Sequence, residues 1–426
     1  MSNRYLDLII ILVVMAVYSL LIYSVLSVNY IQDFTSFYAA ILNLVDHKDP
    51  YQALYSNFLP ISKKLSANLN PPFSMFMFSF LAKFSYQSAL IIWVFLSLIL
   101  GLFGAGLAFY HAFSYPFLKK NWLYLFIIYL SLFSTMINIT VAQFGLILLF
   151  FIMAGYHFYI KNNNLATGIF WGTTIAFKFF PALLLVFIIK QRRYKAFSFT
   201  FCTALMACSI PYFLYGRAIY SNYMSMFSRV SWYGDNWNAS LFGYIYRLFI
   251  HNKFFDINLI ILKFIYVILF FICFFWYIKK MGENNLKEAN HQPFCLTLTM
   301  MLLMSPFGWL YYFPILIFPL LLAGIYAYKS NNFSLLIFIF SLSLINLPQG
   351  YILPTQPASF LLNLSSYSSF FYGLILLNYL SAKRKILLGN NELAYDSKNQ
   401  GFILISSFIV FFALIFTALR FIPHLF

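Results

Sequence analysis

The sequence predicts an all-α, polytopic membrane protein, a transmembrane bundle of about 11–13 helices that forms one domain over residues 1–426. Three observations predict this class. Hydrophobic residues make up 62% of the chain and charged residues 9%, whereas charged residues form about a quarter of an ordinary globular domain. Aromatic residues reach 22%, which suits lipid-facing surfaces and water interfaces. The apolar residues also lack the alternation that is typical of a membrane barrel.

Apolar runs follow one another along almost the whole chain. A bilayer crossing needs roughly 20 apolar residues. The first run, 8–28, lacks a small-residue cleavage site at its end, so we expect a retained signal anchor. Several later runs are short for a full crossing and are compatible with half-helices. The candidate segments are approximately 8–28, 72–85, 87–113, 121–138, 142–160, 165–189, 196–215, 256–278, 294–310, 312–328, 333–347, 359–380 and 402–420.

The net charge of +17 comes from short basic clusters between the apolar runs. Such clusters indicate topology signals and contacts with anionic membrane lipids, not nucleic acid binding. With a cytoplasmic N-terminus and every segment crossing, 14 Lys and Arg residues lie inside and 11 outside, and the clusters KQRRYK, KKMGENNLK and AKRK all lie inside. The four cysteines are interpreted as buried apolar residues, not metal or redox sites: Cys202, Cys208, Cys273 and Cys295.

Two loops are long enough to carry a function, about 29–71 and about 216–255, and both lie outside under this topology. The inside has only short connectors and the polar stretch 389–400. We find no P-loop, and the run GLFGAG at 101–106 lies within an apolar segment, where small residues let helices approach. Substrates are therefore expected to arrive from the membrane or from the outer compartment.

The first loop begins with a carboxylate, Asp33, close behind the first apolar run. A carboxylate at the membrane–water boundary is partly desolvated, which makes it a better base. Phe34–Leu44 has apolar residues at helical spacing, so we expect an interfacial helix that lies flat on the membrane. Asp33 is alternatively the N-cap of that helix, and the two roles are compatible because capping fixes the direction of the carboxylate.

The rest of the first loop contains a small charged group followed by helix breakers. Asp46, His47 and Asp49 offer metal-ligand atoms, although a solvated loop is the favoured interpretation. The Asp-Pro-Tyr run at 49–51 is typical of a turn. Asn70 precedes two prolines, which fix the start of the next segment and stop a helix from running through it.

Lys178 lies in the middle of an apolar run, TTIAFKFFPALLL. A charged side chain near the bilayer centre costs roughly 2.5–3.5 kcal/mol on insertion scales, so such residues usually face a cavity or a bundle interior. Pro181 nearby indicates a kink or a broken helix. Two interpretations stay open: Lys178 points at an anionic group such as a lipid phosphate, or it snorkels from a shallow hairpin.

Polar and aromatic residues gather at three further junctions. Asn138, Thr140 and Gln143 stand between two apolar runs, where amides bind sugar hydroxyls or bond neighbouring helices. The second loop mixes aromatic, Asn and Arg side chains, which suits either carbohydrate or an interfacial aromatic belt. Arg247 has the planar fork that suits phosphate. The third junction, MSPFGWLYYFP at 304–314, offers Trp309, Tyr311 and Tyr312 for a sugar, a phosphate or a belt.

In this order and spacing, the elements resemble glycosyltransferase family 87, within the GT-C superfamily of membrane sugar transferases. The resemblance extends from about residue 33 to residue 321. It departs from the family at two places, where Ala142 precedes Gln143 in a Gly-Gln-x-Asn element and where tyrosines replace the usual His residues after Trp309. It rests on Asp33-Phe34 with Phe37-Tyr38-Ala39-Ala40, Pro50-Tyr51, Pro71-Pro72, Gln143, Gly168 with Lys178 and Pro181, Asn238-x-Ser240-Leu241 before Arg247, and Ser305-Pro306-x-x-Trp309.

The resemblance implies a GT-C type bundle that moves a hexose, often mannose, from a polyprenyl-phosphate-sugar donor to a lipid or glycan acceptor on the outer face of the plasma membrane. It implies inversion, with Asp33 as the general base. We expect no metal site and no cofactor, and we leave a divalent cation open. The donor-phosphate candidates are Lys178, Arg229 and Arg247. The sugar and acceptor candidates are Asp49, Tyr51, Asn70, Gln143, Asn238, Trp309, Tyr311 and Tyr312.

Two alternative functions fit the same membrane architecture. A transporter or flippase of a lipid-linked sugar needs no base, and it is expected to carry charged or broken-helix sites near the midplane, often in repeated halves. The sequence has no convincing repeat, and its polar candidates gather on the outer side. A polymerase or ligase of surface glycans would share the external site and differ in its acceptor.

Overall fold

The computed structural model describes residues 4–27, 33–60, 62–250, 258–282, 290–349, 360–383 and 397–422. Regular structure within these ranges is helical, and the described extended pairings are two isolated bridges, Tyr55 with Lys64 and Asn238 with Trp309. The predicted all-α class is confirmed. The ends of the two predicted outer loops, 29–32 and 251–255, lie outside the described residues. So do parts of the basic clusters at 283–287 and 384–385, and most of the polar stretch 389–400.

Six of the described helices are long and apolar enough to cross a membrane, and a seventh span results if a bent pair is counted as one. The bent pair is α5 (Tyr115–Ser131) with α6 (Phe133–Val141), which meet at 59°. Other predicted segments are shorter apolar helices of 10–17 residues. The chain is thus a polytopic helical membrane protein. The six candidate spans are Leu8–Leu26, Tyr86–Ala112, Tyr194–Tyr215, Leu259–Lys280, Leu310–Lys329 and Phe360–Ser381.

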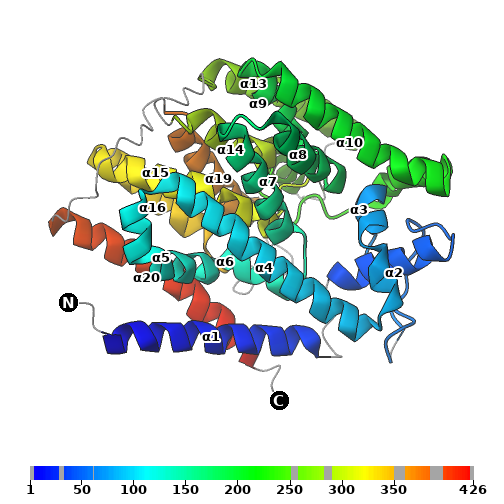
Figure 1. Ribbon diagram of the computed structural model, residues 1–426, viewed down its shortest axis with the longest axis horizontal. Coiled ribbons are helices and arrows are strands. Elements are labelled where there is room, and N and C mark those ends of the chain that lie inside the picture. The colour runs from blue at the N-terminus through cyan, green and yellow to red at the C-terminus, as the bar shows by residue number, and fades with distance from the viewer. Residues whose placement is uncertain are drawn as a thin grey trace. The chain divides into compact units, whose positions relative to one another are not determined.

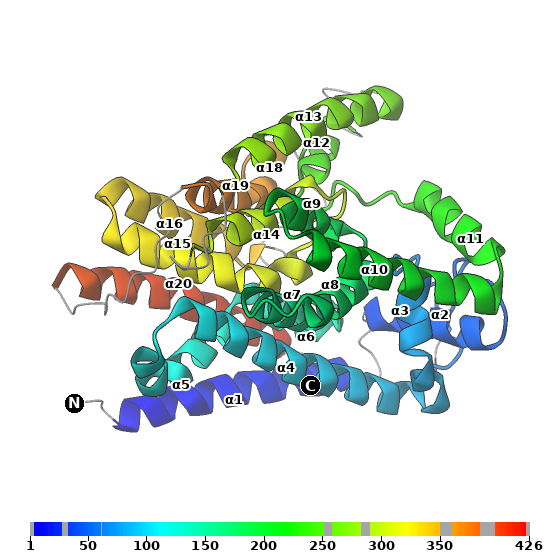
Figure 2. The same cartoon turned by 45° about the horizontal axis from the view of Figure 1, so that its top comes forward.

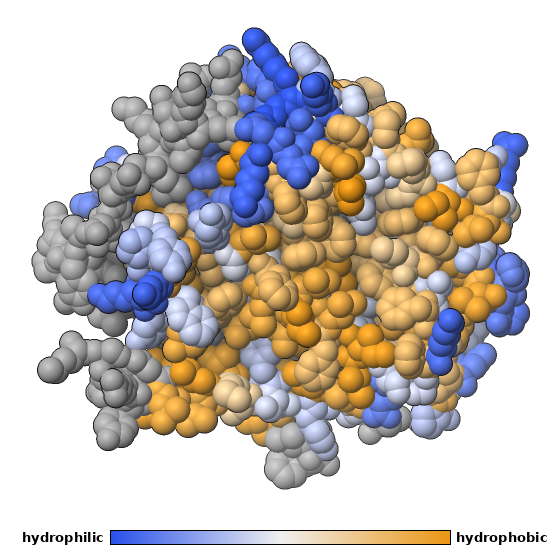
Figure 3. Space-filling model, in the orientation of Figure 1, coloured by the Kyte–Doolittle hydropathy of each residue, from blue (hydrophilic) through white to orange (hydrophobic). Residues whose placement is uncertain are grey.

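The long helices expose large apolar side chains on their surface. Ile260 is 76% exposed and Phe213 79% exposed, and apolar residues cover much of the face drawn in Figure 3, with hydrophilic residues gathered near its margins. Exposure of large apolar side chains on this scale is expected only where lipid, not water, is the solvent.

The chain forms two compact units. Unit 1 comprises Met1–Leu20, Ala105–Met136 and Trp232–Phe426, and unit 2 comprises Leu21–Gly104 and Ile137–Ser231. The helices α1 (Arg4–Leu26), α4 (Tyr86–Ala112) and α6 contribute residues to both. Unit 2 otherwise contains α2 (Asp33–Val45), α3 (Pro72–Met77), η1 (Ser79–Lys83), α7 (Gly145–Ile160), α8 (Asn164–Phe177), η2 (Phe180–Ala182), α9 (Leu183–Lys190), α10 (Tyr194–Tyr215), α11 (Ala218–Met226) and η3 (Phe227–Arg229).

Four helices that pack against one another form the centre of unit 1: α14 (Gln292–Met304), α15 (Ile317–Lys329), α16 (Asn332–Ile345) and α19 (Ser369–Ser381). Polar side chains join them inside the bundle: Asn378 accepts from Thr299 at 3.2 Å, and Ser341 donates to the Gly373 carbonyl at 2.8 Å. Such bonds hold apolar helices together in lipid. The elements of this unit are α5, α12 (Leu241–Phe249), α13 (Leu259–Lys280), α14 (Gln292–Met304), η5 (Leu310–Leu316), α15 (Ile317–Lys329), α16 (Asn332–Ile345), α18 (Phe360–Leu364), η6 (Ser366–Ser368), α19 (Ser369–Ser381) and α20 (Ser397–Phe421).

Unit 2 is organised by α8, which lies beside α7 and α10 in both views (Figures 1 and 2). Glycines permit this close packing. A Cβ on Gly168 would lie 2.7 Å from the backbone of Phe199, and one on Gly172 would lie 2.8 Å from the Thr200 carbonyl. Because Gly168 meets 199–200 and Gly172 meets 200–204, α8 and α10 run in the same direction, and both begin at the same end.

The expectation that 165–189 crosses the membrane as one segment is therefore wrong. The chain runs along α8, breaks at Lys178, and returns through η2 and α9 to the end from which α8 started. Arg193, which precedes α10, donates at 2.5 Å to Asn162, which precedes α8. The segment therefore forms a hairpin with Lys178 at its tip. Lys161 and the KQRRYK cluster share one end of unit 2, so the expected 14-to-11 division of basic residues does not hold.

The helix of the first loop, α2, folds as part of the protein core. Helix α2 begins at Asp33, as predicted, but its residues from Phe34 to Ile41 are buried against protein and not against the membrane surface. The rings of Phe34 and Phe37 lie 5.4 and 5.3 Å from that of Trp93. Segment 72–85, expected as a span, forms the six-residue helix α3 and then η1, because the α-helix ends at Phe78.

Candidate active site

Asp33 and Gln143 meet in unit 2, although 110 residues separate them in the sequence. Gln143 Nε2 donates a 2.8 Å hydrogen bond to Asp33 Oδ2. Asp33 is half-buried and stands in the first turn of α2, where the helix dipole favours a negative charge. The sequence named both residues as candidates, and the fold brings them together.

The turn that presents Gln143 is strained. Ala142 has φ +51°, in the left-handed region that non-glycine residues rarely adopt. Surrounding contacts impose this conformation. The indole of Trp93 donates to the Ala142 carbonyl at 2.8 Å, and the backbone N–H of Gln143 donates to the Asn138 carbonyl at 3.1 Å. Ala142 stands where the resemblance places a glycine, so this chain keeps the backbone shape without the residue that adopts it most easily. Such strain is often found where a side chain must be held in place.

Replacing Ala142 by Val is expected to lower activity strongly, because a β-branched residue at positive φ would force the turn open and withdraw Gln143 from Asp33. The matched control is Ala142→Gly, which adopts the same φ freely and should keep activity. Activity assays of the two purified proteins test this. Equal activity in both variants would show that the turn does not position Gln143.

Lys178 occupies the tip of the α8–α9 hairpin. It ends α8 with extended backbone angles, and its side chain is 7% exposed. The Nζ atom lies 5.4 Å from the centroid of the Phe144 ring, and Lys178 interacts electrostatically with Asp33. The broken helix predicted from Pro181 is present. The sequence did not single out Phe144, which follows Gln143 and places an aromatic face beneath the lysine.

The end of α8 is also bonded to α3, which follows the first loop. Ser74 of α3 donates at 2.7 Å to the carbonyl of Phe177, the residue before Lys178. Helix α3 starts two residues after Asn70. The Asn70 side chain is buried, and its Oδ1 has no hydrogen-bond partner among the described residues. A buried acceptor without a donor is costly unless a bound group supplies one.

Tyr51, Asp49 and Arg229 form a supporting network in unit 2. The Tyr51 hydroxyl donates to the Asn70 carbonyl at 2.8 Å, and Asp49 Oδ1 accepts from the Tyr51 amide at 2.9 Å. Arg229 donates to the Tyr51 carbonyl, so a residue of the predicted second loop holds the first loop. Their side chains are thus engaged in shaping the loop around Asn70.

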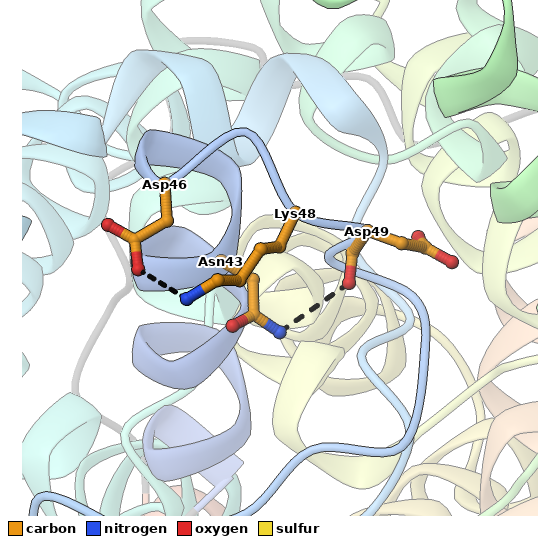
Figure 4. Close-up of polar contacts among 4 residues, drawn as sticks. All are labelled: Asn43, Asp46, Lys48 and Asp49. Carbon is orange, nitrogen blue, oxygen red and sulfur yellow. Dashed lines mark hydrogen bonds and ion pairs between the residues drawn. The ribbon is translucent and has the colours of Figure 1, made fainter.

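The charged group of the first loop is solvated, as the sequence favoured. Lys48 pairs with Asp46 at 3.0 Å on the surface, and Asn43 donates to the Asp49 carbonyl at 3.5 Å (Figure 4). Across the described part of the chain, these residues included, no group of three His, Cys, Asp or Glu side chains is placed to hold a metal ion.

Asn238 and Arg247 belong to unit 1 and organise its loop. The Asn238 amide donates to the carbonyls of Tyr233 and Pro306, both at 2.9 Å, and its Oδ1 accepts from the amides of Ser240 and Gly308, both at 3.1 Å. The side chain thereby makes four hydrogen bonds within the protein, which joins the loop at 233–240 to the junction at 306–308.

Arg247 is 5% exposed and donates mainly to backbone carbonyls. Its Nη1 lies 2.6 Å from the Asp235 carbonyl and 3.2 Å from that of Gly234, and its Nε lies 3.1 Å from Ser368 Oγ. Burial lowers its pKa to about 10, and the negative charge of Asp235 acts in the opposite direction. The sequence identified Arg247 but not these partners, because carbonyl acceptors leave no mark in a sequence.

Asn238→Ala is expected to destabilise the protein by roughly 3 kcal/mol or more, because each buried group left unpaired costs about 1–3 kcal/mol. The matched control is Asn236→Ala, two residues earlier in the same loop. Thermal unfolding of both full-length variants in detergent measures the difference. A melting temperature for Asn238→Ala equal to that of the control would contradict the structural role.

Trp309, Tyr311 and Tyr312 are buried in unit 1 at the start of η5. The rings of Trp309 and Tyr311 are stacked, 6.1 Å apart, and those of the two tyrosines meet edge to face at 4.7 Å. The indole N–H of Trp309 has no acceptor among the described residues. The junction is therefore a packed aromatic layer with one unused donor, and the three residues are not exposed as a belt would be.

The candidates therefore divide between two units. Unit 2 holds Asp33, Asp49, Tyr51, Asn70, Gln143, Lys178 and Arg229, and unit 1 holds Asn238, Arg247, Trp309, Tyr311 and Tyr312.

Comparison with known proteins agrees with the resemblance seen in the sequence. No curated protein and no solved structure matches the chain. The model of glycosyltransferase family 87 matches residues 68–328, which is more than half of the chain. The match includes Asn70, Gln143, Lys178 and Arg247, whereas Asp33 precedes it. The chain therefore belongs to glycosyltransferase family 87 and is a membrane glycosyltransferase.

Proposed function

We propose that this enzyme transfers a hexose, most readily mannose, from a polyprenyl-phosphate-linked donor to a hydroxyl group of a lipid or glycan acceptor. Transfer takes place with inversion at the outer face of the plasma membrane, and the N-terminus is cytoplasmic. One observation carries the proposal: a half-buried carboxylate, Asp33, is oriented by Gln143 and interacts with the buried Lys178. A base beside a cation is the pair that such a transfer needs.

In the proposed step, Asp33 takes the proton of the acceptor hydroxyl as that oxygen attacks the anomeric carbon of the donor. A new carbon–oxygen bond forms on one face, and the bond to the phosphate oxygen breaks on the other, which inverts the anomeric centre. The hydrogen bond from Gln143 keeps the carboxylate in one orientation, and this orientation lets it meet the incoming hydroxyl at a fixed angle.

Lys178 is proposed to bind the donor phosphate. The leaving polyprenyl phosphate gains negative charge as the sugar departs, and a buried ammonium group stabilises that charge more strongly than one in water. The lysine is held at a hairpin tip by the end of α8 and by the Phe144 ring, so it needs little reorganisation during the reaction.

Asn70 is proposed to bind a sugar or acceptor hydroxyl. Its Oδ1 is buried and has no donor among the described residues, and a hydroxyl group would supply one. Tyr51, Asp49 and Arg229 hold the loop that places it. In unit 1, the stacked pair of Trp309 and Tyr311 offers a further aromatic surface and the unused indole donor for the lipid-linked sugar or the acceptor.

The test uses the full-length protein in proteoliposomes with polyprenyl-phosphate donors of several hexoses and a panel of lipid acceptors, with and without a chelator. The expected result is a covalent product whose anomeric configuration, read by NMR, is opposite to that of the donor. Movement of labelled donor across the bilayer without any new glycosidic bond would replace this proposal by a flippase. A product with retained configuration would exclude the single-displacement step.

A further inference from the structure

The hairpin of α8 and α9 brings together two turns that are far apart in the sequence. The turn at 161–163 precedes α8, and the turn at 191–193 precedes α10. Arg193 joins them: it donates to the Tyr159 carbonyl and to Asn162 Oδ1, each at 2.5 Å, and its guanidinium lies 4.3 Å from the centroid of the Tyr159 ring. Both turns therefore belong to one fixed surface at one end of unit 2.

Four exposed cations stand on this surface beside the half-buried Arg193, and we name these four the basic platform: Lys161, Lys190, Arg192 and Lys195. The printed sequence has no Asp or Glu between Asp49 and Asp235. The three acids of unit 2 belong to the first loop, and Asp33 interacts with Lys178, beyond the opposite end of α8. Since α8 has 14 residues, that end is about 21 Å away.

Apolar side chains border the basic platform. Leu165 is 55% exposed, Ile189 45% and Tyr194 64%. Tyrosine and cations next to exposed aliphatic side chains are typical of the membrane–water interface, where lysine and arginine reach the lipid headgroups. Two helices begin and two end here, so the helix dipoles largely offset one another and the side-chain charges decide the local potential.

We propose that the basic platform binds the phosphate headgroup of an anionic phospholipid. The cations supply the charge, Arg193 keeps the two turns in register, and the bordering apolar residues contact the acyl chains. By the positive-inside rule this end of unit 2 lies in the cytoplasmic leaflet, which carries anionic lipids. The proposal does not depend on sugar transfer, and it adds a lipid site remote from Asp33.

The experiment measures binding of phosphatidylglycerol and of phosphatidylcholine to the purified full-length protein by native mass spectrometry. The test variant is Lys161→Gln/Arg192→Gln/Lys195→Gln, which leaves Arg193 in place. The control variant removes three exposed lysines elsewhere in unit 2, Lys63→Gln/Lys64→Gln/Lys83→Gln. Since each basic residue near an anionic surface contributes about a fivefold gain in binding, loss of three should lower the phosphatidylglycerol affinity of the test variant by roughly 100-fold. The control should lose less than about twofold.

A second measurement uses the unmodified protein, so it does not depend on how the variants fold. A photoactivatable phosphatidylglycerol should label the peptides around 161–165 and 189–195, and 0.5 M salt should weaken the labelling, where the Debye length is only about 4 Å. Equal losses in both triple variants, labelling confined to other peptides, or no preference over phosphatidylcholine would overturn the proposal. Displacement by millimolar inorganic phosphate would instead assign the surface to a free anion.

Discussion

Replacing Asp33 by Asn is expected to lower sugar transfer by roughly 10²–10⁴-fold, the contribution of a well-placed general base. Asparagine has nearly the same shape, and its oxygen can still accept the hydrogen bond that Gln143 donates at 2.8 Å. The variant therefore loses the proton acceptor and keeps the local structure. Initial rates with saturating donor and acceptor measure the loss, which should appear in kcat, because donor binding does not need the base.

The matched control is Asp46→Asn in the same loop. Asp46 is exposed and pairs on the surface with Lys48, so its loss should change the rate by less than about twofold. Donor binding to the Asp33 variant should equal that of the unmodified enzyme. Full transfer activity with Asn at position 33 would show that another group removes the acceptor proton.

Replacing Lys178 by Gln is expected to reduce kcat/KM for the donor by roughly 10²–10³-fold, as when one group that stabilises transition-state charge is removed. The lysine is buried at the hairpin tip and interacts with Asp33. Its ammonium therefore acts in a site of low dielectric, where an opposite charge on the leaving phosphate is worth most. The KM for the acceptor should change little, because the acceptor hydroxyl carries no phosphate charge.

The exposed Lys83 of η1 provides the control, since Lys83→Gln removes the same charge from the surface of the same unit. Lys178→Arg restores the charge and should recover part of the donor affinity. If Lys178→Gln changed the acceptor KM as much as the donor KM, or if the arginine variant were no better than the glutamine variant, the lysine would be a structural residue and not a phosphate ligand.

Several parts of the site could be predicted from the sequence because they depend on local chemistry. Asp33 starts α2 as expected, since an acidic residue before an apolar helical run favours a helix start. The break beside Pro181 is present, since proline disrupts the ladder of helical hydrogen bonds. The contact of Gln143 with Asp33 was not predictable, because 110 residues lie between them and no local rule sets their distance.

The length and hydropathy of the apolar runs predict more contact with the membrane than the structure has. Hydropathy measures transfer into an apolar environment, and it does not distinguish lipid from the interior of the protein. Helix α2 was therefore expected on the membrane, although its residues pack against Trp93 and Phe144. For the same reason the run at 165–189 was read as one crossing, whereas it turns back at Lys178.

By itself the sequence determined that this is a membrane protein, that it is helical, and which family it belongs to. These follow from composition, apolar run length and the order of short motifs, all of which are local or additive. Only the tertiary structure decided that Asp33, Gln143 and Lys178 share one place and that Asn238 and Arg247 hold a loop. It also decided that Arg193 bonds to Asn162, in the turn that contains Lys161. The reason is physical: contacts between distant segments depend on how helices pack, and glycines such as Gly168 set that packing only together with the surfaces they meet.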